Sequence, residues 1–191
     1  MRIVVWLSVS APFVSAAGNT FWTGGGVDNT VSGSFAALVG GANNTAIGDY
    51  TFIGGGELNS AQGDYAVVAG GSLNVANAKD TVVAGGRTNQ AVLYGAVVSG
   101  GHENFNNGYD SVVGGGYNNI IAQVGVNASK FVTVGGGTLH AASGYGTSIL
   151  GGSANVVTGE HTTVAGGARN TAGGIGSAVS AGVENRATGA W

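Results

Sequence analysis

The chain has no cysteine and a single proline among its 191 residues. Without cysteine it can form neither a disulfide framework nor a metal site that uses thiolate ligands. Charged residues are also scarce, at 8% of the chain with a net charge of −3, and the basic ones form no cluster. Because nucleic-acid binding requires a basic surface, we expect no nucleic-acid partner. No apolar run is long enough to cross a bilayer, so we expect no membrane span.

Glycine, in contrast, is abundant, with 39 copies, and much of it falls in regularly spaced pairs. A pair returns at a fixed period of about 15 residues, which indicates a stack of small identical units rather than a globular domain with a single site. The one longer step lies between Gly115 and Gly136. We expect a turn at the first glycine of each pair, which is Gly40, Gly55, Gly70, Gly85, Gly100, Gly115, Gly136, Gly151 and Gly166.

Each unit has a regular pattern when its residues are numbered from the first glycine of the pair, which is position 1. Position 14 is always aliphatic, position 12 is mostly small, and position 7 is mostly alanine or valine. This pattern puts positions 12 and 14 on one face of a short strand, with position 7 in a second strand opposite. Glycine at position 9, together with the pair, predicts two turns per unit with positive φ.

Two short strands and two turns in each of these short units predict an all-β fold, a parallel β-solenoid in the form of a flattened roll. Each coil of such a roll adds about 4.8 Å along the axis, so roughly eleven coils would give a rod of about 50 Å.

Position 5 is asparagine in every unit except one, where His140 takes its place. The asparagines are Asn29, Asn44, Asn59, Asn74, Asn89, Asn104, Asn119, Asn155, Asn170 and Asn185. A column of this kind could bind a ligand. We favour a structural ladder, in which the stacked amides bond to one another and to the backbone of the turns.

Position 13 points away from the interior and is apolar over five consecutive units. These residues, Phe52, Val67, Val82, Val97 and Val112, are called the stripe below. An exposed apolar surface of this length indicates a partner. A coil with so thin an interior also gains stability from association. We therefore expect the chain to form a homo-oligomer through this face.

The pattern stands nearly whole in residues 55–71, GGELNSAQGDYAVVAGG. It resembles the YadA-like head repeats of trimeric autotransporter adhesins and related repeats of viral and phage fibres, and the resemblance covers roughly residues 25–191. It implies a left-handed β-roll that assembles as a homotrimer, with adhesion or fibre building as the task. A heptad stalk and C-terminal membrane-anchor strands are missing, so a secreted or particle-bound rod, or a fragment of a longer fibre, fits better than a complete adhesin.

Two segments depart from the repeat. Residues 1–17 read either as a signal peptide or as a degenerate capping coil, ahead of a repeat domain over residues 18–191. The longer step after Gly115 inserts extra residues near 124–129, which must leave the coil as a loop. This loop is a candidate contact site, and its residues are Val124, Gly125, Val126, Asn127, Ala128 and Ser129.

No set of residues predicts catalysis or metal binding, and we expect no enzyme activity and no cofactor. His102, His140 and His161 fall at different positions of different coils, so they do not stack into a metal site. Asp49 and Asp64 share position 10 of adjacent coils, where a solvated charge ladder is favoured over a weak cation site. Aromatic residues collect at positions 10 and 11, as a contact strip for glycans or proteins or as packing of the turn.

The sequence as a whole predicts a non-enzymatic structural or adhesive rod, outside the cell, on the cell surface or on a virion. It would bind surface glycans, matrix or other structural proteins through repeated weak contacts. One alternative is an ice-binding solenoid, which needs a flat outward array of threonines. The other is a minor structural component of a virion or a cell-surface assembly.

Overall fold

A computed structural model describes residues 22–23, 25–123 and 129–190. The expected signal peptide or capping coil, residues 1–17, lies outside the described residues, as do residues 124–128 of the expected loop. The described chain is all-β, as predicted, and it winds through about ten turns of about 15 residues. The described residues include no helix that is long and apolar enough to span a membrane.

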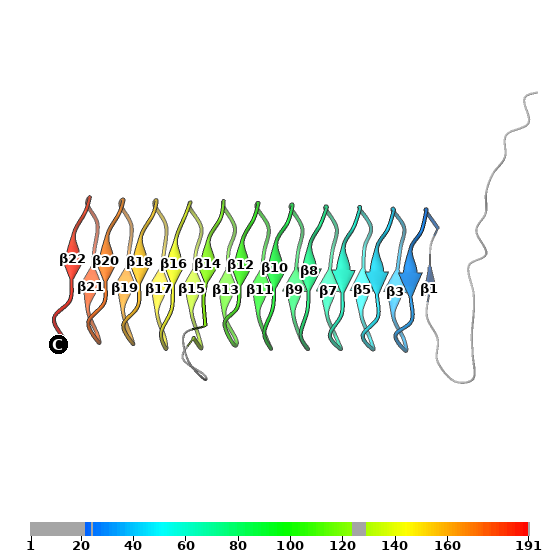
Figure 1. Ribbon diagram of the computed structural model, residues 1–191, viewed down its shortest axis with the longest axis horizontal. Coiled ribbons are helices and arrows are strands. Elements are labelled where there is room, and N and C mark those ends of the chain that lie inside the picture. Colours follow the sequence, from blue (N-terminus) through cyan, green and yellow to red (C-terminus); the bar gives the residue numbers. More distant parts are fainter. Residues whose placement is uncertain (1–21, 24, 124–128, 191) are drawn as a thin grey trace, which may run out of the picture.

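Two parallel sheets of eleven two-residue strands each run the length of the rod on opposite sides (Figure 1). The odd sheet contains β1 (Trp22–Thr23), β3 (Ala37–Leu38), β5 (Phe52–Ile53), β7 (Val67–Val68), β9 (Val82–Val83), β11 (Val97–Val98), β13 (Val112–Val113), β15 (Thr133–Val134), β17 (Ser148–Ile149), β19 (Thr163–Val164) and β21 (Ala178–Val179). The even sheet contains β2 (Thr30–Val31), β4 (Thr45–Ala46), β6 (Ser60–Ala61), β8 (Val75–Ala76), β10 (Gln90–Ala91), β12 (Phe105–Asn106), β14 (Ile120–Ile121), β16 (Ala141–Ala142), β18 (Val156–Val157), β20 (Thr171–Ala172) and β22 (Arg186–Ala187).

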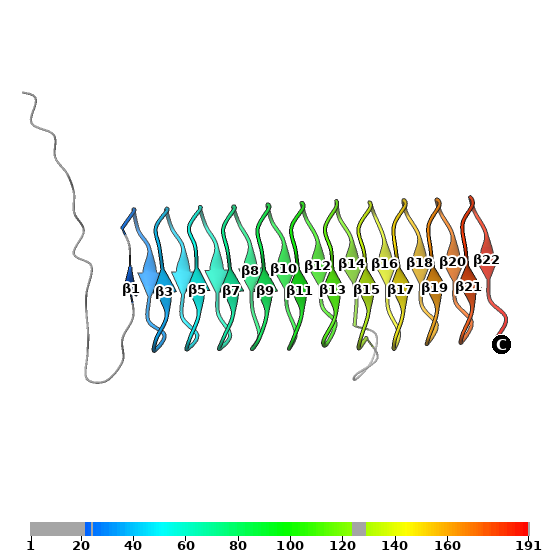
Figure 2. The ribbon, with the colours of Figure 1, turned by 180° about the vertical axis from the view of Figure 1, so that it is seen from behind.

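The strands pair in register from coil to coil, so each position of the repeat becomes a column along the rod. Val67, for example, pairs with Phe52 on one side and Val82 on the other. Positions 7, 12 and 14 point inward and form a thin core of alanine, valine and a few larger side chains such as Leu38 and Ile53. Positions 6 and 13 point outward. The view from behind shows the same regular succession of rungs (Figure 2).

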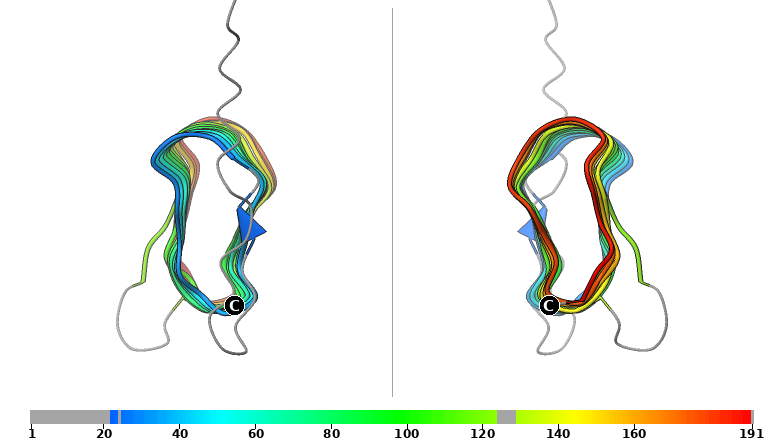
Figure 3. Two further views of the ribbon diagram at one scale, coloured as in Figure 1. Left: turned by 90° about the vertical axis from the view of Figure 1, so that its right-hand side faces the viewer. Right: turned by 90° about the vertical axis from the view of Figure 1, so that its left-hand side faces the viewer.

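The chain reverses direction at two corners per coil, which gives the flattened cross-section seen along the rod (Figure 3). Both corners use the left-handed backbone conformation, at positions 4 and 11. The φ angles are 56° at Leu58 and 59° at Tyr65. Such a conformation costs roughly 1–2 kcal/mol in a residue with a Cβ. It turns each corner amide toward the preceding coil, where Leu58 N donates to Ala42 O at 3.0 Å and Tyr65 N to Asp49 O at 2.8 Å.

The expectation of positive φ at position 9 is wrong, with Gly144 as the exception. Close approach favours glycine in some coils instead, because a Cβ on Gly48 would lie 2.3 Å from the carbonyl oxygen of Gly63, whereas Ala78 and Leu93 occupy this position in two other coils. Within the pair, the tightest requirement falls on the second glycine. Gly152 has φ +98°, and its Cβ would lie 2.1 Å from Gly167 O, whereas a Cβ on Gly151 would meet nothing within 4 Å.

The regular coil of the long unit is interrupted between positions 8 and 9. Ala122 ends the regular part of the coil after β14, and Lys130 returns at position 10, where it pairs with Tyr109. Ser129 therefore takes the place of the glycine at position 9, and its side chain is buried. The prediction that Ser129 belongs to an exposed contact loop is wrong.

The pair Gly151–Gly152 offers a matched test of the turn. We expect Gly152→Ala to destabilise the rod by at least about 2 kcal/mol, because a Cβ there combines backbone strain with a clash against the next coil. Gly151→Ala should be close to neutral. Chemical denaturation followed by circular dichroism measures both. Equal losses in the two variants would contradict this account of the turn.

Candidate functional site

The asparagines of position 5 form one buried column that joins both sides of the turn to the next coil. The Asn74 Nδ2 group donates to Gly70 O in its own coil and to Gly86 O in the next coil, both at 2.9 Å. Its Oδ1 accepts the backbone N–H of Asn89 at 3.0 Å. The same three bonds recur at Asn44, Asn59, Asn89, Asn104 and Asn170.

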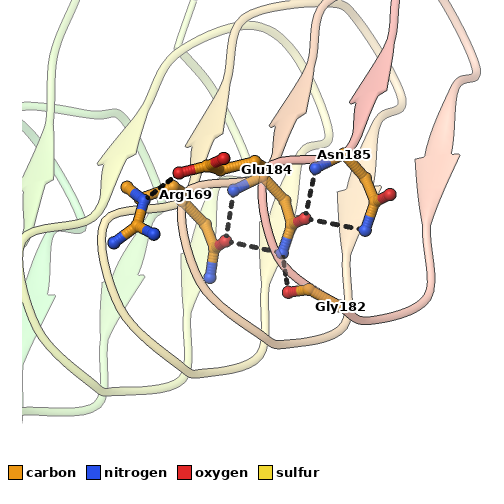
Figure 4. A network of polar contacts seen from close by, with 6 residues as sticks. Arg169, Gly182, Glu184 and Asn185 are labelled. Atoms are coloured by element: carbon orange, nitrogen blue, oxygen red, sulfur yellow. Dashed lines mark hydrogen bonds and ion pairs between the residues drawn. The ribbon is translucent and has the colours of Figure 1, made fainter.

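Of the two kinds of bond expected, those between neighbouring amides are the less regular part of the column. Asn104 Nδ2 reaches Asn89 Oδ1 at 3.1 Å, and Asn119 Nδ2 reaches Asn104 Oδ1 at 3.0 Å, but the bonds to backbone are present in more coils. Figure 4 shows the last members of the column, with Gly182 O accepting from the amide of the preceding coil. The column is thus occupied by structural hydrogen bonds and leaves its amides few free groups for a ligand.

An exposed ion pair lies beside the end of the column. Arg169 Nε contacts Glu184 Oε1 at 2.8 Å (Figure 4), with both side chains more than 60% exposed. A pair this open to solvent contributes little to stability.

His140 continues the asparagine column with poorer hydrogen bonding. Its Nδ1 accepts the N–H of Asn155 at 3.1 Å, which places the ring proton on Nε2. The Nε2 group is buried and has no hydrogen-bond partner among the described residues. Burial lowers the pKa of His140 below its ordinary value of 6.5, and the backbone groups of Asn155, Gly152 and Gly136 offset only part of this effect.

The stripe residues form a continuous outward column on the odd sheet. Phe52, Val67, Val82, Val97 and Val112 pair in sequence along β5–β13, and the column continues with Thr133, Ser148 and Thr163. Position 15 lies beside it and carries only small or apolar residues. The odd face is defined as the outward residues of positions 13 and 15, from Ala37 to Ser180, and it contains no charged residue.

The charged residues of the described chain gather at the two corners. At positions 3 and 4 they are Asp28, Glu57, Arg87, Glu103, Arg169 and Glu184, and at positions 10 and 11 they are Asp49, Asp64, Lys79, Asp80, Asp110, Lys130 and Glu160. Arg186, on the last strand of the even sheet, is the one charged side chain of the described residues on a sheet. Both sheets are therefore flanked by charged residues but nearly free of them, a separation that was not predicted from the sequence.

The aromatic side chains at one corner stack on one another. The rings of Phe35 and Tyr50 lie 4.9 Å apart, those of Tyr50 and Tyr65 lie 5.0 Å apart, and the Lys79 Nζ sits over the Tyr65 ring at 5.5 Å. Sugars that stack on aromatic residues need a free ring face. Within this stack the faces of Tyr50 and Tyr65 are covered, which favours packing of the turn over a glycan strip.

The acidic column at position 10 also bonds to the backbone. Asp49 Oδ1 accepts the N–H of Ser34 at 2.8 Å, and Asp64 Oδ1 accepts the N–H of Asp49 at 3.0 Å. These carboxylates hold adjacent coils together, in addition to any solvated charge. Within the described residues no three His, Asp or Glu side chains are grouped so that they could share a metal ion.

A buried asparagine inside the coil was not predicted from the sequence. Asn106 occupies position 7, where the other units have alanine, valine or isoleucine, and its Nδ2 donates to Val97 O at 3.0 Å and Ser111 O at 2.8 Å. It therefore links the even sheet to the odd sheet across the core. The side-chain hydroxyl of Ser111, one coil before the insertion, in turn accepts the N–H of Val132 at 3.0 Å. The only available sequence signal was a polar residue in an apolar column.

No family model and no curated protein matches the chain. The candidate functional surface is thus described by geometry alone: a rigid coil held by the asparagine column, with two faces nearly free of charge between charged corners.

Removing one amide tests the column. We expect Asn74→Ala to lower the free energy of unfolding by about 3 kcal/mol or more, because it leaves the Gly70 and Gly86 carbonyls and the Asn89 N–H without this partner. Asn77→Ala is the matched control, since Asn77 is exposed in the same coil. Denaturant titration measures both, and a loss no larger than that of the control would show that the column is dispensable.

The lowered pKa of His140 predicts a pH dependence of stability. The unfolded chain takes up a proton near pH 6.5 and the folded chain does so only at lower pH, so stability is complete above 6.5 and falls as the pH drops below it. His140→Asn should raise stability by about 1 kcal/mol by restoring the regular bonds. It should also flatten the profile between pH 7 and pH 5. His161→Asn, at an exposed corner, is the control. A profile unchanged by His140→Asn would contradict this assignment.

Proposed function

We propose that the chain is a non-enzymatic structural or adhesive rod that associates with copies of itself through the odd face. The observation that carries the proposal is the composition of that face. Over ten successive rungs it carries no charge, and its position 13 column is apolar from Ala37 through Phe52 to Val112. Phe52 and Val112 are 38% and 37% exposed, so this apolar surface stays open in the single chain. Soluble monomers rarely expose a continuous apolar surface of this length.

The rigidity of the coil supports a mechanical task. Each coil is bonded to the next through two sheets, two corners and the asparagine column, so neighbouring surface residues repeat at a fixed spacing. A partner that matches one rung can match the next, and many weak contacts then add to a strong one. Surface glycans, matrix components and other structural proteins are the partners proposed for such a rod. The proposed setting is extracellular, at the cell surface or on a virion.

From the resemblance to adhesin head repeats, we propose in addition that the chain assembles as a homotrimer and that its coil is left-handed. The alternative assignments are an ice-binding solenoid and a minor component of a virion or a cell-surface assembly. Thr30 and Thr45 do pair on the even sheet, but Ser60 and Val75 follow them, so the threonine column is short. We favour protein–protein contact over ice binding, because the position 13 column is apolar and uncharged, whereas ice binding needs a regular array of hydroxyl groups.

Placing a charge in the stripe tests self-association. We expect the wild-type chain to sediment as an oligomer and Val82→Asp to sediment as a monomer, because a carboxylate buried between two apolar faces lacks a partner. Leu58→Asp is the control. It adds the same charge at the position 4 corner, where Asp28 already has the same backbone conformation. Analytical ultracentrifugation over a concentration series measures all three. A wild-type chain that stays monomeric would overturn the proposal.

A further inference from the structure

His140 makes one junction of the asparagine column weaker than the others. At a regular junction, such as that between Asn74 and Asn89, two side-chain bonds cross to the next coil, one from the amide nitrogen and one to the amide oxygen. At His140 only the second kind is present, because Nδ1 accepts the N–H of Asn155 while Nε2 has no hydrogen-bond partner. A single column bond therefore holds the junction between His140 and Asn155.

A second proton on the ring would remove this remaining bond. Since Nε2 already carries the ring proton, the second proton goes to Nδ1, which then becomes a donor facing the N–H of Asn155, another donor. The ring is 1% exposed, so its charge would also be buried. Burial lowers the pKa of His140, whereas an opened junction restores the ordinary value of 6.5, so acid favours opening as the pH falls below 6.5.

The surroundings of His140 offer its charged form no counter-ion. Its neighbours in the column are asparagines, and the strands of these coils, β14–β18, contain no acidic, basic or histidine residue. Tyr117, which is 42% exposed, is the titratable residue of this corner in the same three coils. The nearest charged residues of the corner within the described chain are Glu103 and Arg169, each two coils away. The charged residues at positions 10 and 11 lie at the opposite corner.

The coils that follow this junction contain further unpaired polar groups. Residues 136–190 are called the C-terminal block and residues 25–113 the N-terminal block. The other buried side-chain polar atoms without a partner, among the described residues, are Thr147 Oγ1 and Ser177 Oγ, both at position 12 of the C-terminal block. In the N-terminal block Thr51 Oγ1, at the same position, donates to a backbone carbonyl at 2.9 Å. Because unpaired buried groups lower stability, we expect the C-terminal block to be the less stable one.

The apolar stripe lies wholly within the N-terminal block, from Phe52 to Val112. In the C-terminal block the same outward column carries Ser148, Thr163 and Ala178. Self-association through the stripe would therefore hold the N-terminal block and would leave the C-terminal block without apolar contacts to a partner. The two blocks differ both in their internal bonding and in the surface that they offer.

We propose that His140 is an acid-sensitive junction: when its ring gains a second proton, the C-terminal block opens as a unit while the N-terminal block stays folded. Each coil of a solenoid contacts only its neighbours, so one part of the stack can open without the rest. Opening shortens the rigid rod and leaves the stripe in place. The junction thus adds control by pH to the rod function proposed above.

Hydrogen exchange of the full chain at pH 7 and pH 5, corrected for the intrinsic effect of pH on exchange, tests the junction. Protection of the amides in β16–β22 should fall by up to about 25-fold, the limit for one proton with an ordinary pKa of 6.5. Protection in β5–β11 should not change. His140→Asn should abolish the fall. Thr147→Val, which introduces the side chain that Val132 already has at position 12, should raise protection at both pH values and keep the difference between them.

Three results would overturn the junction. Protection could be unchanged by acid, could fall equally in both blocks, or could still fall in His140→Asn, which would assign the effect to other groups of the C-terminal block, such as the exposed Glu160, His161 and Glu184. His161→Asn should behave as the wild type does, and circular dichroism at pH 7 establishes that each variant is folded. A monomeric wild-type chain whose C-terminal block alone loses protection would overturn self-association and support the junction.

Discussion

The fold depends on one recurrent interaction, in which a buried asparagine amide bonds to the carbonyls of a glycine pair in two successive coils. A coil this narrow cannot bury the carbonyls of its turn without partners, because each unpaired buried carbonyl would cost about 1–3 kcal/mol. The amide supplies two donors to those carbonyls, and its oxygen accepts the next coil's N–H. Each side chain thus bonds within its own coil and to the next, so the stack is held together at the same point in every turn.

The glycine pair follows from this arrangement. A Cβ at the second glycine of a pair, Gly71 for instance, would lie 2.7 Å from Asn74 Nδ2 and 2.1 Å from the carbonyl oxygen of Gly86. The amide and the glycine therefore require each other. His140 shows what happens when the amide is replaced, because the ring keeps the acceptor at Nδ1 but leaves Nε2 without a bond. One such substitution is tolerated among ten regular neighbours.

The spacing of the glycine pairs, together with the small and aliphatic residues between them, was enough to predict the two strands per coil, the inward positions and the outward stripe. The left-handed corners were not predictable in the same way. Leu58 and Tyr65 adopt positive φ because the preceding coil accepts their N–H groups, and neither residue type signals this conformation. Ser129 was missed because its burial depends on how the insertion rejoins the coil, and Asn106 was missed because it is a polar residue at an inward position that is otherwise apolar. The two sheet faces that are nearly free of charge could not be predicted from the sequence, because the positions of the corners decide where the charged residues lie.

We propose that the separation of charged corners from nearly uncharged walls suits this coil to assembly with other copies, provided that the asparagine column keeps its walls rigid. Amide hydrogen exchange tests that rigidity most directly. The backbone N–H of a column asparagine donates to the position 5 side chain of the preceding coil, as Asn59 does to Asn44 Oδ1 at 2.9 Å. The account predicts that these amides exchange as slowly as neighbouring strand amides, such as that of Ser60. Exchange at Asn59 as fast as in an exposed turn would contradict it.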